Sequence, residues 1–558
     1  MGGADARSPS GIESVAPGLL GKDCGVKAPA YSYIVVGAGA AGCVVANRLS
    51  EDPTTTVLLL EAGGPDRNPL IHIPVGFTKL TSKGVNWGFS TVPQPQLNDR
   101  EMWYPQGRTL GGSTSINAMI YIRGNRSDYD GWEALGNPGW GYDGVLPYFR
   151  RSENNTRLNN EFHGVGGDLN VTQQVQHNPL TCAFVRAWQE LGVDFNADVN
   201  GAKQDGVTFY DVTQRNARRE SAATAFLRPA MKRPNLAVIT KARATKVLFE
   251  GKKAIGVEYR HGGQTHAARA DGEVVLSGGA VNSPRLLLLS GVGPAEHLRG
   301  VGVDVVHDLP GVGQNFQDHM DVNMIAETTP VSYNEEDRWD RAIRHMFQYL
   351  LYKTGPMTIC IAEAGAFIRS SDAVESPDIQ VHCLPVMNID HGRQRRKGHG
   401  VTINTCHLRP HSIGSVSLRT AWPEDPPAVD PNYLGDPEGY DWRTSIAGFR
   451  RGRELLTTKE LSPYVTREHL PGKDVQTDEE IKSYIRKWAR TDYHPVGSCA
   501  MGPGEDAVVD TQLRVRGIDN LRVIDASIMP RVISGNTQAP SIMIGEKGAA
   551  IMRAGELV

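Results

Sequence analysis

The chain has 558 residues, 40% of them apolar and 22% charged, which is typical of a globular protein of about two to four domains. A net charge of -3 excludes a chain-wide attraction to nucleic acid, so such a partner would need a local basic patch. The seven cysteines are scattered and never spaced as C-x-x-C, so we expect neither a disulfide framework nor a metal site.

The N-terminal residues 1–29 predict a flexible tail, since they are rich in Gly, Ala, Ser and Pro. They lack the basic and apolar stretches of a secretion signal, and no apolar run in the chain approaches the roughly 20 residues that cross a bilayer. We therefore expect a soluble, cytoplasmic protein. The sequence leaves open a peripheral contact with the inner face of a membrane.

The first predicted elements form a nucleotide-binding unit. An apolar strand at 33–36 is followed by a helix at about 40–49 and by a second apolar strand at 57–60, and Glu61 stands at the end of that strand. This order of strand, helix, strand and acid is the context in which a glycine-rich turn binds a dinucleotide.

Each residue of the turn has a physical task. Gly37 permits the tight turn, Gly39 lets the backbone approach a pyrophosphate, and Gly42 lets the helix pack closely on the strand. The phosphates would lie against free N–H groups at the helix N-terminus, where the peptide dipoles favour anions. Glu61 can accept hydrogen bonds from ribose hydroxyls.

Short apolar runs between 235 and 276 predict β-strands separated by glycine-containing and charged turns. We expect them to form a meander beside the nucleotide-binding sheet. The segment 283–291 begins with Ser and Pro and ends with Gly, which predicts a short buried helix. The chain lacks a second complete dinucleotide unit, so one large cofactor is the simplest interpretation.

An amphipathic helix is predicted over 338–352, where apolar residues recur at the i, i+3, i+4, i+7 and i+8 positions starting from Ile343. We favour a helix whose apolar face packs on a sheet over a helix that faces a membrane. A basic cluster at 393–397, flanked by glycines, predicts a solvated loop. Contact of this loop with anionic lipid, or gating of a site by it, stays open.

Three further segments resemble the signatures of the glucose-methanol-choline (GMC) oxidoreductases, which bind FAD. The first is 107–117, and the second is 279–293, followed by the related run 311–319. The third is C-terminal and consists of 492–499, with the sequence DYHPVGSC, and 535–540, with the sequence GNTQAP. The resemblance covers nearly the whole chain, and its nearest branches are the bacterial alcohol dehydrogenases and the choline dehydrogenases.

The resemblance implies that His494 and Asn536 face the reactive edge of the flavin. His494 would take the proton of a substrate hydroxyl while a hydride leaves the same carbon for flavin N5, a task that suits an imidazole with a pKa of about 6.5. Asn536 would hold and orient the alkoxide oxygen, in the manner of an oxyanion hole. Asp318 and His319 are expected to have a structural role.

The remaining site residues are those that the resemblance places against FAD. They are Gly37, Gly39, Ala40, Ala41, Gly42, Glu61, Gly111, Gly112, Asn117, Ala118, Met119, Val247, Asp525, Ala526, Asn536 and Thr537. Ile116 stands where some relatives have a histidine that bonds covalently to the flavin, so we expect FAD to be held noncovalently.

The implied fold is an α/β protein with a Rossmann-like FAD-binding domain of the GMC type, into which a mixed α/β substrate-binding domain is inserted. We expect the FAD-binding domain over 30–325 and 491–558. The substrate-binding domain is expected mainly over 326–490, with further segments within about 150–230.

The implied reaction is the FAD-dependent oxidation of a primary alcohol to an aldehyde, with the electrons passed to a quinone-like acceptor. Choline dehydrogenase and oxygen-using alcohol oxidase are alternatives within the class, and a fatty-acid photodecarboxylase or an FAD-containing lyase are alternatives outside it. The pair of His494 and Asn536 favours alcohol oxidation, because the photodecarboxylase branch lacks this pair at the flavin edge.

Overall fold

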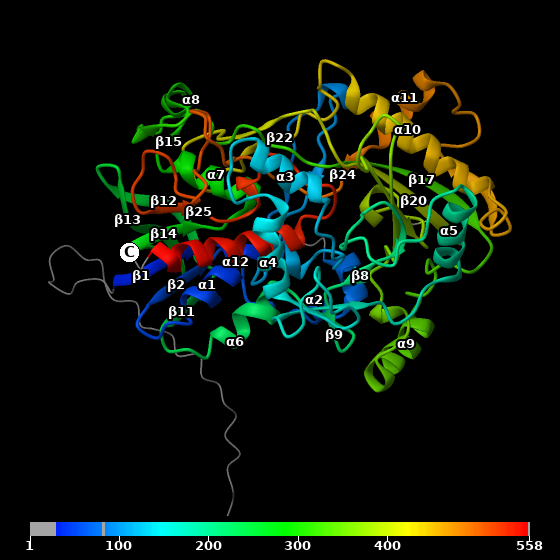
Figure 1. The fold of residues 1–558 in the computed structure, drawn as a ribbon, viewed down its shortest axis with the longest axis horizontal. Helices are drawn as coiled ribbons and strands as arrows, with labels where there is room; N and C mark the ends of the chain where they lie inside the picture. Colours follow the sequence, from blue (N-terminus) through cyan, green and yellow to red (C-terminus); the bar gives the residue numbers. More distant parts are fainter. Residues whose placement is uncertain (1–29, 81–83, 395, 556–558) are drawn as a thin grey trace, which may run out of the picture.

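The computed structural model describes residues 30–80, 84–394 and 396–555. The expected N-terminal tail and Arg395 of the basic cluster lie outside these residues. In the described part of the chain, two seven-stranded sheets organise the fold (Figure 1). One sheet carries the nucleotide-binding unit, and the other is built largely from the middle of the chain. The α/β architecture predicted from the sequence is confirmed.

The first sheet has the strand order β11-β2-β1-β14-β13-β12, and β25 pairs with β14. Its strands are β1 (Ala30–Val36), β2 (Val57–Glu61), β11 (Leu236–Thr240), β12 (Arg243–Glu250), β13 (Lys253–His261), β14 (Gln264–Leu276) and β25 (Leu521–Val523). The expected meander is right for β12 to β14, which pair antiparallel. It is wrong for β11, which pairs parallel with β2 at the opposite edge, because a short apolar run fits either kind of neighbour.

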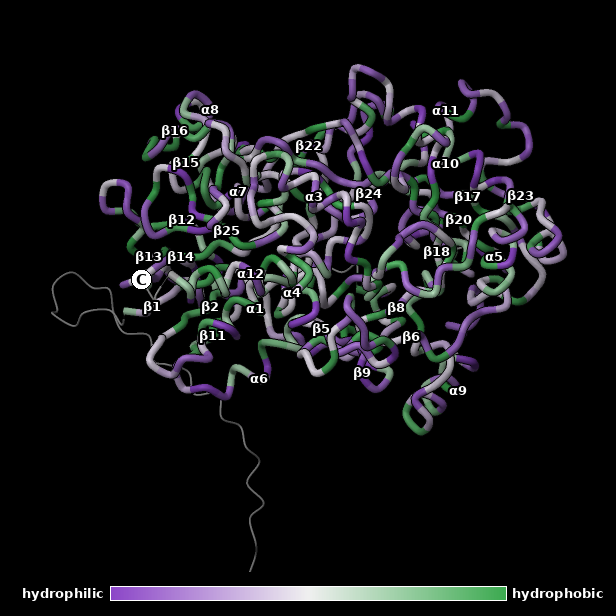
Figure 2. Tube along the Cα trace, viewed as in Figure 1, coloured by the Kyte–Doolittle hydropathy of each residue, from purple (hydrophilic) through white to green (hydrophobic). Residues whose placement is uncertain are grey.

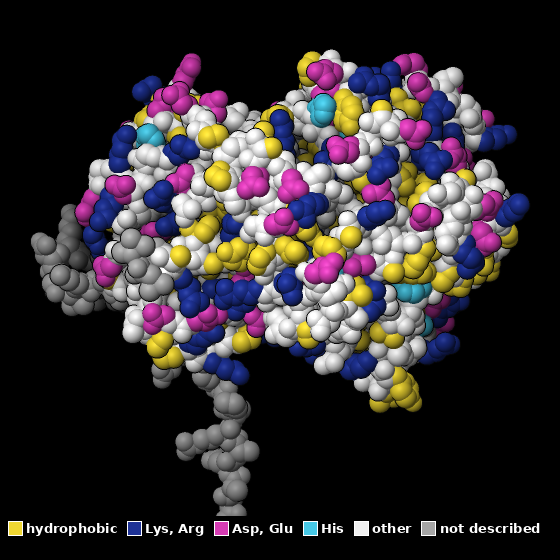
Figure 3. Space-filling view, in the orientation of Figure 1, with side chains coloured by type: hydrophobic (Ala, Val, Ile, Leu, Met, Phe, Trp, Pro, Cys, Tyr) yellow, Lys and Arg dark blue, Asp and Glu magenta, His cyan; other side chains and the backbone are white. Residues whose placement is uncertain are grey.

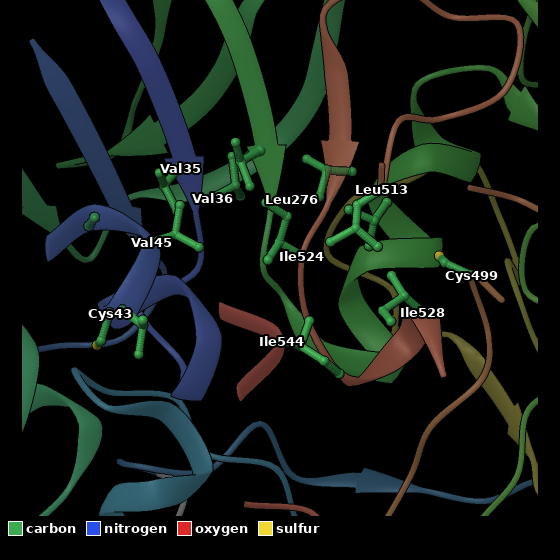
Figure 4. Close-up of a cluster of buried hydrophobic side chains, with 14 of the residues drawn as sticks. Val35, Val36, Cys43, Val45, Leu276, Cys499, Leu513, Ile524, Ile528 and Ile544 are labelled. Carbon is green, nitrogen blue, oxygen red and sulfur yellow. The ribbon is translucent and has the colours of Figure 1, made fainter. Parts of the chain in front are cut away.

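Helices α1 (Ala40–Leu49) and α12 (Gln538–Gly555) come from opposite ends of the chain and pack on each other beside this sheet (Figure 1). Apolar stretches gather in the interior of this half of the molecule (Figure 2). Side chains from both helices and from the strands fill the core between them, among them Val35, Val45, Leu276, Ile524 and Ile544 (Figure 4). The two ends of the sequence therefore share one core.

Helix α7 (Gly279–Leu289) confirms the predicted short buried helix, but it begins before the predicted start at 283. Ser283 was expected to cap the helix, but it lies inside it, and its hydroxyl donates to Asp525 Oδ2 at 2.5 Å. Pro284 also lies inside the helix. A Ser-Pro pair satisfies the pattern of a helix start, while here the serine hydroxyl has a buried carboxylate as its partner.

The second sheet has the order β23-β17-β20-β19-β18-β7, with β24 paired to β17, and its pairs are antiparallel. Its strands are β7 (Gly206–Phe209), β17 (Met320–Thr328), β18 (Ala364–Ile368), β19 (Ile379–Leu384), β20 (Gly400–His407), β23 (Val465–Leu470) and β24 (Arg490–Thr491). Strand β17 spans the boundary expected at 325, and β7 comes from the 150–230 stretch.

Further helices surround the two sheets (Figure 1). They are α3 (Arg126–Ala134), α4 (Tyr142–Ser152), α5 (Pro179–Glu190), α8 (Ala295–Gly300), α10 (Tyr440–Glu454) and α11 (Asp478–Trp488). Helix α4 packs on α12, and α10 packs on β20. Searching the described residues for a helix long and apolar enough to span a bilayer finds none.

Helix α9 (Trp339–Tyr352) confirms the predicted amphipathic helix, but its expected packing on a sheet is wrong. Only His345 and Tyr349 of this helix are buried, and most of its large apolar side chains are exposed. The periodicity identified an apolar face, but it does not say what covers that face. In the basic loop, Arg393 and Arg396 are exposed, as expected for a solvated segment.

Candidate active site

A cavity opens at the carboxyl-terminal edge of the first sheet. Its wall is formed where β1, β2 and β14 end, by the turns that follow them, and by the N-terminal ends of α1 and α7. Ligands of open sheets with parallel strands bind in the crevice at this edge. The cavity therefore lies where the nucleotide-binding motif requires it.

The turn between β1 and α1 has the geometry of a pyrophosphate cradle. Gly37 has a φ of +104°, a conformation that favours glycine. A Cβ atom at Gly42 would lie 1.9 Å from the Gly37 carbonyl oxygen, so the helix packs closely on the turn. A Cβ atom at Gly39, in contrast, would meet no atom of the described residues closer than 3.8 Å, and Gly39 lines the cavity. Its backbone is therefore open to a ligand.

Polar groups around the cavity suit a dinucleotide. Buried Glu61 accepts hydrogen bonds from the N–H groups of Ala38 and Gly63 at 2.9 and 2.7 Å, and burial raises the pKa of its carboxyl to about 7. Arg285 lines the cavity, and its buried Nε atom has no hydrogen-bond partner among the described residues. Since a buried donor needs an acceptor, this guanidinium and the open turn fit the phosphates of FAD.

Most of the predicted FAD contacts reach this cavity. Its lining includes Gly37, Gly39, Ala40, Ala41, Glu61, Gly112, Asp525, Ala526 and Thr537. Gly42 and Gly111 pack against residues that line the cavity or adjoin its lining. Gly42 lies against Gly37, and the Gly111 N–H donates to the Ala38 carbonyl oxygen at 2.8 Å. The structure does not bring Val247 to the cavity, because it is buried in β12 and its N–H donates to Ser290 Oγ at 2.8 Å. Residues 242–244 line the cavity in its place.

Asn117, Ala118 and Met119 lie beside the C-terminal site segment instead. The Asn117 amide donates to Gln538 Oε1, and its Oδ1 atom accepts hydrogen bonds from the Met119 N–H at 3.0 Å and from Arg219 at 2.7 Å. Arg219 is buried, which lowers its pKa to about 9. These contacts tie the first signature loop to the segment that carries Asn536 and Thr537.

The structure brings His494 and Asn536 together. Asn536 Nδ2 lies 3.0 Å from His494 Nε2. Gln380 donates to Asn536 Oδ1 at 3.3 Å, which orients the amide so that its NH₂ group faces the imidazole. His494 Nε2 therefore accepts a hydrogen bond and carries no proton.

A second histidine leads to the same protonation state. His319 Nε2 lies 3.0 Å from the Leu408 carbonyl oxygen, and a carbonyl can only accept, so His319 Nε2 carries the proton. His319 Nδ1 is then an acceptor, and it lies 3.0 Å from His494 Nδ1, which must donate. His494 is thus neutral, with its proton on Nδ1 and a lone pair on Nε2. This is the form that a general base requires.

Backbone pairing holds the two histidines together. Strand β24 pairs with β17, and the Asp492 N–H donates to the His319 carbonyl oxygen at 2.8 Å. Buried Asp318 accepts a hydrogen bond from the His494 N–H at 2.8 Å. Tyr493 has a φ of +69°, a costly conformation for a non-glycine residue. The chain therefore turns sharply just before His494, and its surroundings hold it in that turn.

Burial sets the charges of the site. It lowers the pKa of His494 to about 4 and that of His319 to about 3, so both rings are neutral at pH 7. Asp492 Oδ2 lies 3.5 Å from His494 Nδ1. Burial alone would raise the pKa of Asp492, but the positive charge that His494 carries when protonated, together with a hydrogen bond from His382, holds it well below its usual range. The carboxylate is thus placed to stabilise the imidazolium that forms when His494 takes a proton.

The sequence reasoning missed Gln380, His382 and Tyr210. The Tyr210 hydroxyl lies 2.9 Å from His382 Nδ1 and accepts a hydrogen bond from Gln380 Nε2 at 3.0 Å. Gln380 and His382 are two residues apart on β19, so they share one face of a buried, largely apolar strand. Polar residues at alternating positions of such a strand are the signal that could have revealed them.

Two family models, both described as GMC oxidoreductase, match residues 31–321 and 410–545. The chain belongs to the GMC oxidoreductase family. The alcohol dehydrogenase (acceptor) of Pseudomonas putida is 48% identical over 529 residues, which cover 94% of this chain and 95% of that protein. The mitochondrial choline dehydrogenase of Homo sapiens is 43% identical over 538 residues, which cover 94% and 90%.

Solved structures of GMC oxidoreductases share the fold. Pyridoxine 4-oxidase from Mesorbium loti superposes with a TM-score of 0.85 at 30% identity, covering 94% of this chain and 99% of that chain. Formate oxidase from Aspergillus oryzae, in a study of FAD modification, reaches 0.89 at 25% identity, covering 95% and 100%. The protein is thus an FAD-binding oxidoreductase that acts on CH–OH donors.

Replacing Gly39 by Val is expected to weaken FAD binding by about 10- to 100-fold. The new side chain meets no close protein atom but fills space at the cavity wall, and overpacking a site costs about 1–3 kcal/mol, or about tenfold per 1.4 kcal/mol. The measurement is the ratio of FAD to protein after gel filtration, with the melting temperature of the apoprotein as a check on folding. The matched control is Gly131→Val, where a Cβ atom enters open space on α3. Equal FAD contents in the two variants would contradict this role for Gly39.

Proposed function

We propose that this GMC oxidoreductase oxidises a primary alcohol to the aldehyde, with His494 as the general base and Asn536 as the group that holds the alkoxide oxygen. Bound FAD supplies the hydride acceptor. The observation that carries the proposal is the pairing of an unprotonated imidazole nitrogen with an amide NH₂ group 3.0 Å away.

The two groups define where the alcohol oxygen binds. The bound alcohol replaces the direct hydrogen bond between these two groups. Its oxygen lies about 2.8 Å from both His494 Nε2 and Asn536 Nδ2, donates its proton to the first and accepts from the second. As the proton moves to His494, Asp492 balances the new positive charge, and the Asn536 amide faces the growing negative charge on oxygen. His494 is 7% exposed, so this exchange takes place largely out of water.

The side chains packed near this point favour an alkyl chain over a quaternary ammonium group. An apolar cluster that contains Met119, Cys360 and Ala362 also contains Tyr210, whose hydroxyl contacts Gln380. The three aromatic residues that could have formed a cage for choline do not converge. Tyr333 bonds to Glu363, Trp339 is exposed on α9, and Trp422 lies exposed beneath Arg260.

The finer part of the proposal is a quinone-like electron acceptor. It rests on similarity to an alcohol dehydrogenase whose name specifies an acceptor. Quinones with long apolar tails dissolve in the lipid phase, since each buried CH₂ group is worth about 0.8 kcal/mol. A protein that reduces them must therefore reach a membrane surface, which is the peripheral contact that we propose with this acceptor.

Anaerobic titration of the purified holoenzyme tests the reaction. We expect 1-octanol to bleach the flavin absorbance, benzyl alcohol to do so less completely, and choline and glucose to leave it unchanged at the same concentrations. Bleaching by choline alone would identify a choline dehydrogenase. A flavin that no alcohol reduces would contradict the proposal and favour the photodecarboxylase or lyase chemistry. Adding either air or a soluble quinone to the reduced sample, and following reoxidation of the flavin, distinguishes an oxidase from a dehydrogenase.

A further inference from the structure

The apolar face of α9 is the main cluster of exposed hydrophobic side chains in the described part of the chain. Seven of the sixteen large hydrophobic residues exposed there belong to this helix, with Trp339 at 78% and Leu351 at 69% exposure. The other nine come from many different elements. In Figure 3, hydrophobic side chains form the projecting tip at the lower right, where Figure 1 shows α9.

The exposed side chains form one continuous surface. At about 100° per residue, positions 339, 343, 346 and 350 form a stripe along the helix, and 347 and 351 widen it on one side. His345 and Tyr349, the two buried residues, lie on the other side of the stripe and attach the helix to the body. The helix therefore turns its broad apolar face outward.

Contacts at both ends hold α9 in this orientation. Before the helix, the Tyr333 N–H donates to the Pro385 carbonyl oxygen at 2.9 Å, and the Tyr333 hydroxyl donates to Glu363 Oε1 at 2.9 Å. Within the helix, His345 Nε2 lies 2.6 Å from Glu336 Oε2, which precedes α9 in the chain. After it, the Cys360 N–H donates to Gln174 Oε1 at 3.0 Å. The segments before and after α9 are therefore fixed to the rest of the protein by hydrogen bonds, so the outward orientation of the helix is set by the fold.

The charges around the face suit a lipid surface that carries negative headgroups. Arg344 is exposed next to the stripe and makes no ion pair among the described residues, and Lys353 follows the last turn over the Tyr349 ring. The acids nearby are neutralised: Asp340 pairs with Arg338, and Glu336 pairs with Arg341. Trp339 and Tyr352, at the two ends of the helix, are residue types that prefer the boundary between lipid and water.

We propose that α9 docks this protein on an anionic lipid membrane by inserting its apolar face at the boundary between headgroups and acyl chains. A projecting helix with an apolar face, bordered by cations, binds such a boundary without a complementary groove. The other exposed hydrophobic residues of the described chain come from many different elements, so a second copy could cover the face only with its own α9. The docking does not depend on which alcohol the site oxidises.

The test is cosedimentation of the holoenzyme with vesicles of phosphatidylglycerol and phosphatidylethanolamine in equal parts. We expect the wild-type protein to sediment with these vesicles, less so with pure phosphatidylcholine, and less as salt is raised. The triple variant Ile343→Ser, Phe347→Ser, Leu350→Ser is expected to lower the vesicle partition coefficient by at least tenfold. Because these side chains are exposed, FAD content and melting temperature should stay at wild-type values.

The matched control is the triple variant Leu135→Ser, Val165→Ser, Val175→Ser, which removes three exposed hydrophobic side chains from other elements. It should bind the vesicles as the wild-type protein does. The proposal is overturned if wild-type protein stays in the supernatant, or if the α9 variant binds as tightly as the control. A wild-type dimer that becomes monomeric in the α9 variant, with no vesicle binding by either, would assign the face to a second copy instead.

Discussion

Replacing His494 by Ala is expected to slow the reduction of the flavin by alcohol by about 10²- to 10⁴-fold, the usual contribution of a positioned general base. The variant loses the imidazole lone pair, which among the described residues is the only acceptor of a hydrogen bond from the Asn536 NH₂ group. FAD should stay bound, because the predicted contacts that line the cavity leave His494 out. Anaerobic stopped-flow absorbance at saturating alcohol measures the rate.

The pH dependence separates a base from a residue that only supports the fold. Burial lowers the pKa of His494 to about 4, so its neutral, proton-accepting form is fully present above that pH and is lost as the pH falls through it. The wild-type rate should therefore be flat from pH 6 to 9. In His494→Ala the alcohol must ionise unaided, so the residual rate should rise about tenfold per pH unit. His261→Ala, at the exposed end of β13, should behave as wild type. A flat profile for His494→Ala would exclude His494 as the base.

The glycine turn of this site could be predicted because its conformation depends on residues that are neighbours in the sequence. The glycine turn at 37–42 needs a strand before it, a helix after it and small residues between them, and all of these are contiguous in the sequence. The structure accordingly has α1 at the predicted residues, with the cavity at its N-terminus. His494 and Asn536 came from resemblance alone, since they are 42 positions apart and nothing in the sequence between them fixes their separation in space.

The groups that control His494 lie far from it in sequence and could not be predicted from it. His319 reaches His494 because β17 and β24 pair antiparallel, and Gln380 reaches Asn536 from the middle of the second sheet. Such pairings depend on the register of the whole sheet, which a local pattern leaves undetermined. Helix α9 shows the same limit, since its periodicity was correct but its partner was not.

Replacing Asn536 by Ala is expected to lower kcat for alcohol oxidation by about 10²- to 10³-fold, the usual effect of removing one oxyanion-hole donor. Asn536 Nδ2 faces the position where the alcohol oxygen becomes negative, and this charge exists only in the transition state. KM should therefore stay nearly constant while kcat and kcat/KM fall together. Steady-state kinetics with a soluble acceptor, at a fixed FAD content, measures both constants.

Two further variants decide whether Asn536 acts through the charge it stabilises or only through the space its side chain fills. Asn536→Asp keeps the shape of the side chain but replaces the donor by a carboxylate, which repels the growing charge on oxygen, so its loss should equal or exceed that of the Ala variant. Gln380→Ala removes only the group that orients the Asn536 amide, so its loss should be smaller. The proposal would be contradicted by an Asn536→Asp variant close to wild-type activity, or by a Gln380→Ala variant as impaired as Asn536→Ala. Either result would mean that Asn536 acts by filling space and that another group donates to the alkoxide.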